Sequence, residues 1–198
     1  MIEPVLALLA AQGYKVFMRP FELNIIGIRS ANGTPNAFDD SIYAIYRNDK
    51  RQWVVHSYQA TTDPGLYWLN HPLNPNGTAI LKCGQYRNSH MIGLHRNKYT
   101  ALVQCGPVTV IRDADRNGSL DMAGKEDTGL FGINIHRALE EGETQHIDKF
   151  SAGCQVFANA TDFDAFMKMC QTHRQLYGNG FSYTLVNQSP VFTIQSDN

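Results

Sequence analysis

The chain has 198 residues, of which 43% are hydrophobic and 11% aromatic, so it is long enough to fold around a sizeable core. Its 17 basic and 18 acidic residues leave a net charge of −1. This balance excludes the strongly positive field that nucleic-acid binding requires. No stretch reaches the roughly 20 apolar residues of a membrane span. We expect one domain over residues 1–198, with its core at about residues 23–187 and no nucleic-acid partner.

The N-terminal segment predicts a short helix over residues 1–12. Val5, Leu8 and Leu9 recur at helical spacing, and Gly13 follows them as a stop signal. The apolar run at residues 5–11 follows Glu3 and has no basic flank, so it does not resemble a secretory signal. We therefore expect a chain that is made without a signal peptide.

The central part of the sequence is typical of strands separated by turns. Four stretches are rich in β-branched and aromatic residues, at 24–29, 41–47, 53–60 and 99–105. Turn signals lie at 32–35, 48–49, 63–65 and 76–77. Residues 108–112 predict a further strand, which leads into a polar loop at 113–127. The pattern predicts an antiparallel sheet system.

Residues 132–138 alternate strictly between apolar and polar positions. This alternation places Ile133 and Ile135 on one face of a strand, and Asn134 and His136 on the other. We expect the isoleucines to be buried and His136 to point away from them. A charged linker at residues 139–149, which we expect to be exposed, follows this strand.

The C-terminal part predicts an amphipathic helix. Thr161 and Asp164 resemble a capping box, and apolar residues recur at helical spacing from Phe163 to Cys170. Gly178 suits the position after the helix, and residues 181–186 predict a final strand. The fold class is therefore α+β and β-rich.

Four cysteines occur, at positions 83, 105, 154 and 170, without CxxC spacing, so structural zinc is not predicted. Without a secretory signal, reduced thiols are the expectation. Cys170 lies on the apolar stripe of the predicted helix, which favours a buried, inert role. Cys154 differs from the other three, because His136 lies in the predicted strand that precedes it in the sequence.

His136 and Cys154 form a candidate catalytic pair. Fourteen residues separate His136 from Ser151-Ala152-Gly153-Cys154. A thiol reacts as its thiolate, so it requires a nearby base and partial exposure. Gly153 permits a sharp turn that exposes amide N–H groups to an oxyanion, and Ser151 can fix this turn through its hydroxyl.

These residues resemble the signature of the L,D-transpeptidase catalytic domain. In that family an apolar strand ending in histidine precedes a loop and Ser/Thr-x-Gly-Cys, and residues 132–136 and 151–154 correspond to these parts. The family also has a Thr-Pro-x-Gly-x-Phe/Tyr turn after a strand, which TDPGLY at residues 62–67 matches with one residue of difference. The resemblance covers about residues 53–157.

The resemblance implies an L,D-transpeptidase-like mixed sheet or sandwich core that requires no cofactor. Cys154 would attack a carbonyl of a peptidoglycan stem peptide, between an L-centre and a D-residue. His136 would take the thiol proton, and the backbone carbonyl of Arg137 would hold the imidazole. The thioacyl-enzyme would then pass to an amine, giving a cross-link, or to water, as in an L,D-carboxypeptidase or endopeptidase.

The chain departs from the family at positions that shape the donor site. Ala152 stands where the family often has His or Lys, Val156 where Arg or Asn is common, and Arg137 where glycine is usual. Polar residues near the pair are candidate substrate contacts. They are Tyr86, His95, Arg96, Asn134 and Gln155.

A second motif offers oxygen ligands from one tight loop, in the manner of an EF-hand. Its candidate ligands are Asp113, Asp115, Asn117, Ser119 and Asp121. The position of the bidentate glutamate is occupied by Gly124. The motif indicates a structural calcium site, with a solvated loop of Asx-turns as the alternative.

We predict an enzyme that acts on peptidoglycan stem peptides. The missing export signal favours cleavage, by a phage lysis protein, an effector injected into rival cells or a recycling enzyme. Such a chain is cytoplasmic or reaches the cell wall by a route without a signal. The alternative is an inactive module of the same fold that binds cell wall or calcium. A general cysteine peptidase ranks last, because Asn134 lies about 7 Å along the strand from His136, too far to orient it.

Overall fold

The computed structural model describes residues 2–34 and 36–188. Met1 of the predicted N-terminal helix, Pro35 of the turn predicted at 32–35, and residues 189–198 lie outside this description. The chain is α+β and β-rich, as predicted, with a large mixed sheet. Across the two described ranges, no helix is long and apolar enough to cross a membrane.

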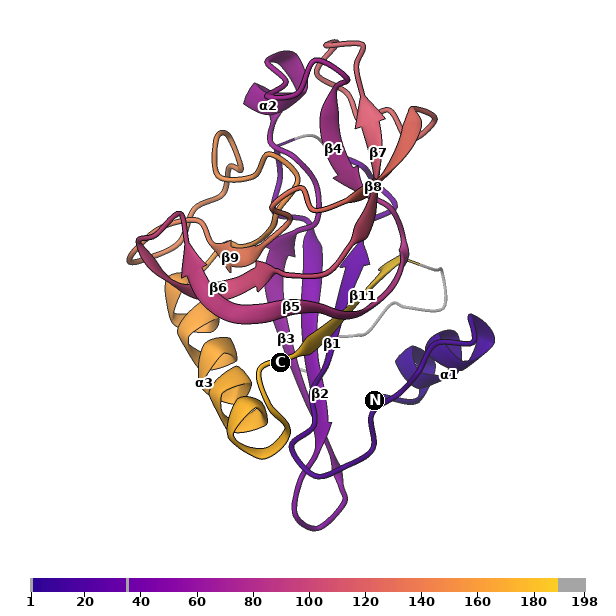
Figure 1. Ribbon diagram of the computed structural model, residues 1–198, viewed down its shortest axis with the longest axis vertical. Helices are drawn as coiled ribbons and strands as arrows, with labels where there is room; N and C mark the ends of the chain where they lie inside the picture. Colours follow the sequence, from indigo (N-terminus) through magenta and orange to yellow (C-terminus); the bar gives the residue numbers. More distant parts are fainter. Residues whose placement is uncertain (1, 35, 189–198) are drawn as a thin grey trace.

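Eight strands close on themselves into a mixed barrel in the order β1-β11-β5-β6-β9-β10-β3-β2 (Figure 1). They are β1 (Asn24–Arg29), β2 (Asp40–Arg47), β3 (Trp53–Thr61), β5 (Gly84–His95), β6 (Tyr99–Gln104), β9 (Ile135–Arg137), β10 (Gln155–Phe157) and β11 (Phe181–Asn187). The β1–β11 and β9–β10 pairs are parallel and the others antiparallel. The main sheet is therefore closed.

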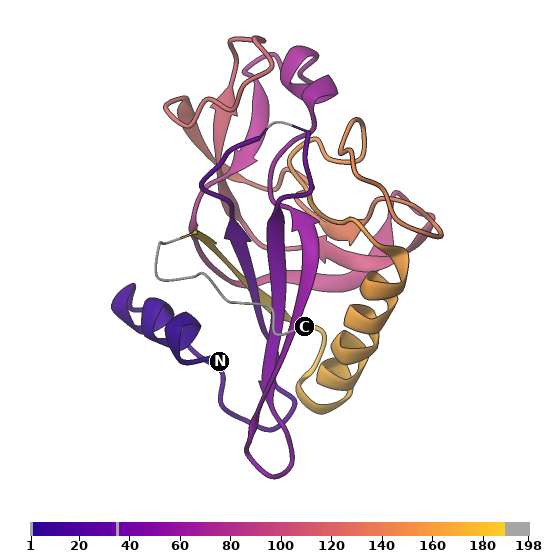
Figure 2. The ribbon, with the colours of Figure 1, turned by 180° about the vertical axis from the view of Figure 1, so that it is seen from behind.

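A smaller antiparallel sheet contains β4 (Thr78–Leu81), β7 (Val108–Asp113) and β8 (Lys125–Gly129), with β7 in the centre. It stands beyond one end of the barrel, next to the short helix α2 (Leu66–Asn70) (Figure 1). Helices α1 (Glu3–Ala11) and α3 (Ala160–Tyr177) lie on opposite sides of the barrel in both views (Figures 1 and 2).

The main core fills the barrel and extends under α3. Phe163 and Phe166 of α3 are buried against Phe157 of β10, with ring centroids 5.5 and 5.0 Å apart. Cys170 is fully buried on the same helix, as its place on the apolar stripe predicted. Full burial of each such aromatic side chain contributes about 1.5–3 kcal/mol, which fixes α3 against β10 and thereby the segment that carries Cys154.

The sequence located most of the regular strands to within a residue or two. It missed β4, β5, β8, β10 and α2. Strand β5 begins with polar residues, QYRNSH at positions 85–90, and therefore lacks the alternation that indicates a strand. Strand β8, KEDTG, begins inside the predicted loop at 113–127 and extends beyond it, and it is a charged edge strand of the smaller sheet. Charge is typical of sheet edges, where it opposes pairing between molecules.

The strand predicted at residues 132–138 is shorter than expected. Only Ile135–Arg137 is paired as a strand, and Gly132, at φ +74°, turns the backbone before it. Ile133 and Ile135 are buried as predicted. His136, which was expected to point away from the isoleucines, is not exposed on its own face of the strand, since only 3% of the residue is accessible. Both faces of the strand are covered.

Two details of the C-terminal third also differ from expectation. The helix begins at Ala160, and the side-chain oxygen of Asn159 caps it by accepting the N–H groups of Thr161 and Asp162. Thr161 is therefore inside the helix and does not cap it. The segment at 139–149 is mostly exposed, but Ile147 is buried beside Phe38 and attaches this segment to the barrel.

Candidate active site

A cavity of about 510 Å³ opens where the smaller sheet meets the end of the barrel that carries Cys154. Its polar lining includes His95, Arg96, Asn134, His136 and Cys154. Its other walls come from α2 and β4, from β7 and from the segment before β9, and they include Trp68, Leu73, Arg112, Leu130, Phe131 and Phe150. The cavity therefore combines both residues of the candidate pair with apolar surface and two arginines.

The turn that carries the cysteine is fixed by its own hydrogen bonds. Ser151 donates from Oγ to the Cys154 carbonyl at 2.8 Å and accepts the Gly153 N–H at 3.2 Å. Gly153 has φ +121°, and a Cβ there would lie 2.3 Å from the Ala79 carbonyl oxygen. Only glycine fits at this place. Ser151 fixes the turn as predicted, whereas the Gly153 N–H is occupied within it.

The turn at residues 62–67, which carries part of the family resemblance, packs directly on the cysteine turn. The Gly65 N–H donates to the Ser151 carbonyl at 2.9 Å. A Cβ at Gly65 would lie 2.1 Å from the Asp148 carbonyl oxygen, so a side chain is excluded there. The spacing of this motif thus has a structural role in supporting the Ser151–Cys154 turn.

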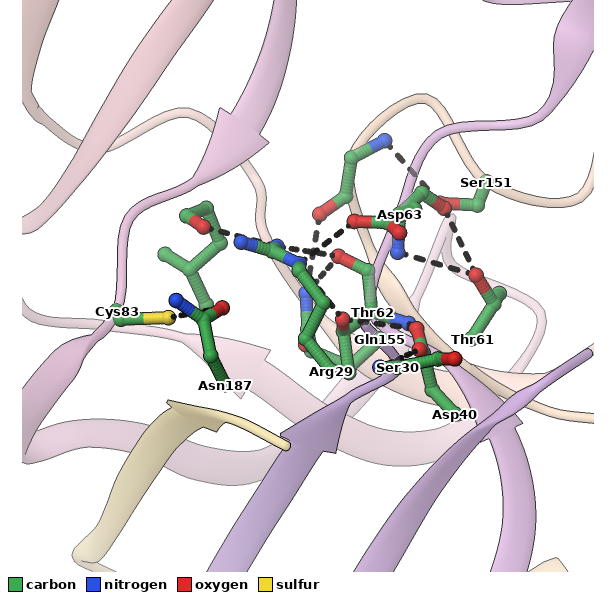
Figure 3. Close-up of polar contacts among 12 residues, drawn as sticks. Arg29, Ser30, Asp40, Thr61, Thr62, Asp63, Cys83, Ser151, Gln155 and Asn187 are labelled. Carbon is green, nitrogen blue, oxygen red and sulfur yellow. Dashed lines mark hydrogen bonds and ion pairs between the residues drawn. The ribbon is translucent and has the colours of Figure 1, made fainter. Parts of the chain in front are cut away.

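A buried polar cluster lies beneath both turns (Figure 3). Arg29 of β1 forms an ion pair with Asp63 at 2.8 Å and donates to the carbonyls of Thr62 and Leu81. Asp40 of β2 accepts the Thr62 N–H at 2.6 Å. Gln155 donates to the carbonyls of Thr62 and Gly153, so the cluster connects the barrel to the cysteine turn.

His136 is oriented by the carbonyl that the family resemblance assigns to this role. Its Nδ1 lies 2.8 Å from the Arg137 carbonyl oxygen, which also accepts the Tyr99 hydroxyl at 3.1 Å. A carbonyl oxygen only accepts hydrogen bonds, so Nδ1 carries the proton of the neutral ring. The lone pair of the neutral imidazole is therefore on Nε2, which is the arrangement of a general base.

Pairing of β9 with β10 brings the two candidate residues together. His136 is the parallel partner of Val156, which places Cys154, two residues earlier, on the same face of the sheet. The Cys154 sulfur accepts the Asn134 N–H at 3.5 Å and donates to the Gly132 carbonyl at 3.3 Å. Within the described residues no hydrogen bond joins this thiol to the His136 ring. Hydrogen bonds between a nucleophile and its base are often long or poorly aligned in sites that hold no ligand.

Burial keeps both members of the pair neutral. Burial, together with the neighbouring ring of His95, lowers the pKa of His136 to about 3. Burial raises the pKa of the Cys154 thiol, against the opposing effects of the Asn134 N–H and the Arg96 charge. The thiol remains partly exposed toward the cavity. The resting site therefore contains a thiol and an imidazole, and not a thiolate and an imidazolium.

His95 is in closer contact with the pair than the sequence indicated. Its ring stacks on that of His136, with centroids 4.1 Å apart and planes 23° apart. Its Nδ1 lies 3.1 Å from Nδ2 of Asn134. His95 is the last residue of β5, a strand that the sequence did not predict, so its approach to His136 had no signal in the sequence.

Other predicted substrate contacts lie elsewhere. The Tyr86 hydroxyl shares its single proton between the carbonyls of Lys82, at 2.6 Å, and Thr109, at 3.1 Å, outside the cavity lining. Gln155 is fully buried and bonded to Tyr183, so it supports the turn from below. The side chain of Arg137 lies over the Tyr99 ring, and only its carbonyl faces the site. Arg96 and Asn134 do line the cavity.

The sequence did not single out Tyr99 or Arg112, which the structure places beside the site. Tyr99 shares the Arg137 carbonyl with His136. Arg112 lines the cavity while it pairs with Asp127 at 2.9 Å and lies over the Phe131 ring. Both residues lie on strands that the sequence predicted. Their position beside the site depends on contacts with residues that are distant in the sequence, so the sequence did not indicate it.

The aspartate-rich loop lies at the end of β7. Asp113 is fully buried, its Oδ2 accepts the Asp121 N–H at 2.9 Å, and its Oδ1 has no hydrogen-bond partner among residues 2–34 and 36–188. Asp115 and Asn117 accept N–H groups within the loop, as Asx-turns do. In the part of the chain that the structure describes, no three His, Cys, Asp or Glu side chains are grouped to hold a metal ion.

Comparisons of the chain with protein-family models, with curated proteins and with solved structures found no match.

Proposed function

We propose that the protein is a cysteine-dependent acyltransferase or hydrolase of the L,D-transpeptidase type, acting on peptidoglycan stem peptides. The observation that carries this proposal is the cavity in which Cys154 and His136 share one face of the β9–β10 pair. The hydrogen bond between His136 and the Arg137 carbonyl supports it further, since it leaves Nε2 free to act as a base.

In the proposed first step, the Cys154 proton passes to Nε2 of His136 as the sulfur bonds to the substrate carbonyl carbon. The tetrahedral adduct then collapses, the C–N bond breaks, and the leaving amine takes the proton from His136. Water or a second amine, deprotonated by His136, then attacks the thioester and releases the thiol. The thiol must first turn from the Gly132 carbonyl toward His136.

The cavity lining supports a peptide substrate that carries carboxylates. Arg96 places positive charge on its wall, whereas the charge of Arg112 is already paired with Asp127, and a guanidinium group favours paired contacts with a carboxylate. Trp68, Leu130 and Phe131 offer apolar surface for the aliphatic parts of the stem. A volume of about 510 Å³ accommodates a few residues of such a peptide.

The test is intact-protein mass spectrometry after incubation with purified tetrapeptide and pentapeptide stems. We expect wild type to gain an acyl group on Cys154 and to release a D-amino acid. Cys154→Ala is expected to abolish both, and His136→Ala to slow acylation by about 10²-fold or more. Cys105→Ala is the matched control, because Cys105 is exposed and lies outside the cavity. Equal product from wild type and Cys154→Ala would refute the proposal.

We also propose that the aspartate-rich loop binds calcium weakly. The favouring observation is Asp113, whose fully buried carboxylate has an oxygen without a hydrogen-bond partner among the described residues. Burial raises the pKa of Asp113 and Asp115 raises it further, against the lowering effect of the hydrogen bond from the Asp121 N–H. At Gly124 a Cβ would lie 2.1 Å from the Arg112 carbonyl oxygen, so no bidentate side chain fits there. We therefore expect a Kd of about 10⁻⁴–10⁻³ M.

Calorimetric titration with calcium tests this site. Wild type is expected to release heat on binding, Asp115→Ala to lose that heat, and Asp49→Ala, in the exposed turn before β3, to keep it. If wild type gives no heat, the loop is a set of Asx-turns without a metal, and the inactive calcium-binding alternative is removed with it.

A further inference from the structure

We propose that Asn134 and His95 are positioning residues: Asn134 fixes the tautomer of His95, and the His95 ring holds His136 in its orientation, while the Arg137 carbonyl sets the His136 tautomer. This inference rests on the proposed role of His136 as the base. Asn134 contacts three parts of the site, through its side-chain oxygen, its side-chain nitrogen and its backbone N–H.

The orientation of the Asn134 amide follows from its neighbours. Its Oδ1 accepts the backbone N–H of Gln104 at 2.8 Å, and that N–H can only donate. Its Nδ2 therefore faces Nδ1 of His95 at 3.1 Å. Because an amide NH₂ can only donate, Nδ1 of His95 must accept, and the proton of this ring is on Nε2.

This tautomer determines the charge of His95. A protonated ring would point an N–H at the NH₂ group of Asn134, which is repulsive, so the amide disfavours the imidazolium form. The same ring is 7% exposed, and burial and the charge of Arg96 both lower its pKa. A neutral ring is thus held in place between Asn134 and His136.

The neutral His95 ring covers His136 on one face. The stack, with centroids 4.1 Å apart, excludes water from the His136 ring and restricts its rotation. The remaining groups in contact with His136 are Tyr99 of β6 and the Arg137 carbonyl of β9, while Cys154 lines the same cavity and the charge of Arg96 acts on the ring. Two histidines with opposite tautomers, Nε2–H at His95 and Nδ1–H at His136, therefore lie face to face.

The thiol is connected to the same residue. The backbone N–H of Asn134 donates to the Cys154 sulfur at 3.5 Å, while its side chain determines the tautomer of His95. A shift of Asn134 therefore moves the contacts of the nucleophile and of the base together. The chemistry requires the two groups to approach in a fixed geometry, which is the function of a positioning residue.

Nitrogen-15 NMR of the histidine rings in wild-type protein is the first test. We expect His95 to be protonated on Nε2 and His136 on Nδ1 throughout the neutral pH range. Asn134→Asp keeps an oxygen for the Gln104 N–H but replaces the donor to His95 with an acceptor. We expect this substitution to move a proton onto Nδ1 of His95. A wild-type His95 protonated on Nδ1 would overturn the proposal without any variant.

The second test is the pH profile of acylation by p-nitrophenyl acetate, measured as nitrophenolate release in a Cys105→Ser background. Wild type is expected to acylate Cys154 at a rate that is flat through weakly acidic pH, because the base has a pKa of about 3. His95→Ala admits water to His136, so its pKa rises and the acid limb moves to higher pH. We expect acylation near pH 5 to slow by about tenfold relative to pH 8.

His56→Ala is the matched control, because His56 also stacks on aromatic rings but lies outside the cavity. It is expected to keep the wild-type profile. An unchanged profile in His95→Ala would refute the positioning role. The two proposals fail separately: if p-nitrophenyl acetate acylates wild type and His136→Ala equally, the base assignment is wrong, whereas the tautomers at His95 and His136 are still read directly by NMR.

Discussion

The thiol and the imidazole of the candidate pair are both neutral at rest, which determines how the site can react. Burial lowers the pKa of His136 to about 3 and raises the pKa of Cys154. A cysteine that rests as thiolate reacts with alkylating agents even in weak acid. Here the proton must leave the sulfur during the attack, so reactivity depends on an acyl group placed in the cavity.

At the residue scale, we therefore predict slow alkylation of Cys154 by iodoacetamide. The rate is expected to rise only as pH exceeds the ordinary thiol pKa, with no fast plateau between about pH 5 and 8. Peptide mapping by mass spectrometry follows Cys154 and Cys105 in the same sample. A fast plateau in acid would indicate a thiolate–imidazolium pair and contradict the pKa directions of both residues.

Among the elements, the turn between residues 151 and 154 positions the nucleophile, and it does so through close backbone contacts. The Ser151 hydroxyl closes the turn, the Gly65 N–H binds it from one side, and the Ala79 carbonyl of β4 approaches Gly153 from the other. The smaller sheet thus contributes backbone to the turn as well as a wall to the cavity.

The corresponding prediction concerns Gly153→Ala. Its Cβ would lie 2.3 Å from the Ala79 carbonyl oxygen at a φ of +121°, so β4 and the turn must separate. We expect the free energy of unfolding to fall by about 3 kcal/mol or more, as measured with denaturant. Gly142→Ala is the control, since Gly142 also has positive φ but open space around its Cβ, and its cost is expected to be about 1 kcal/mol. Similar losses in the two variants would contradict the contact.

At the scale of the whole molecule, a buried polar cluster connects the barrel to the candidate site. Arg29, Asp40 and Asp63 come from β1, from β2 and from the turn after β3, and the ends of these strands meet beneath the cysteine turn (Figure 3). Burial, together with the charge of Asp63, raises the pKa of Asp40 to about 7. Folding therefore favours the protonated form of Asp40.

The sign of the resulting pH dependence follows from linkage. Since the folded pKa exceeds the unfolded value of about 3.9, the contribution of Asp40 to stability is complete in acid and is lost as pH rises toward about 7. We predict that the free energy of unfolding decreases over this range and that Asp40→Asn flattens the decrease. Asp49→Asn, in an exposed turn, should leave the slope unchanged. If the slope persists in Asp40→Asn, titratable groups other than Asp40 cause the pH dependence.

The sequence by itself determined the elements whose signals are local. Stretches rich in β-branched and aromatic residues between turn signals located β1, β2, β3 and β6, the strands predicted at 108–112 and 181–186 located β7 and β11, and helical spacing located α3. The motif around His136 and Cys154 identified two residues that the fold places in one cavity. The role of the Arg137 carbonyl in holding the imidazole was implied by the family resemblance and matches the hydrogen bond observed.

Only the tertiary structure decided the surroundings of the pair. The burial of His136, the stack with His95 and the amide contact of Asn134 depend on β5, β6 and β9 lying side by side, and strand pairing is a property of distant segments. Tyr86 and Gln155 were expected to contact the substrate, yet their side chains form hydrogen bonds elsewhere. Local patterns determine which face of a strand is apolar, whereas closure of the barrel decides which polar groups meet.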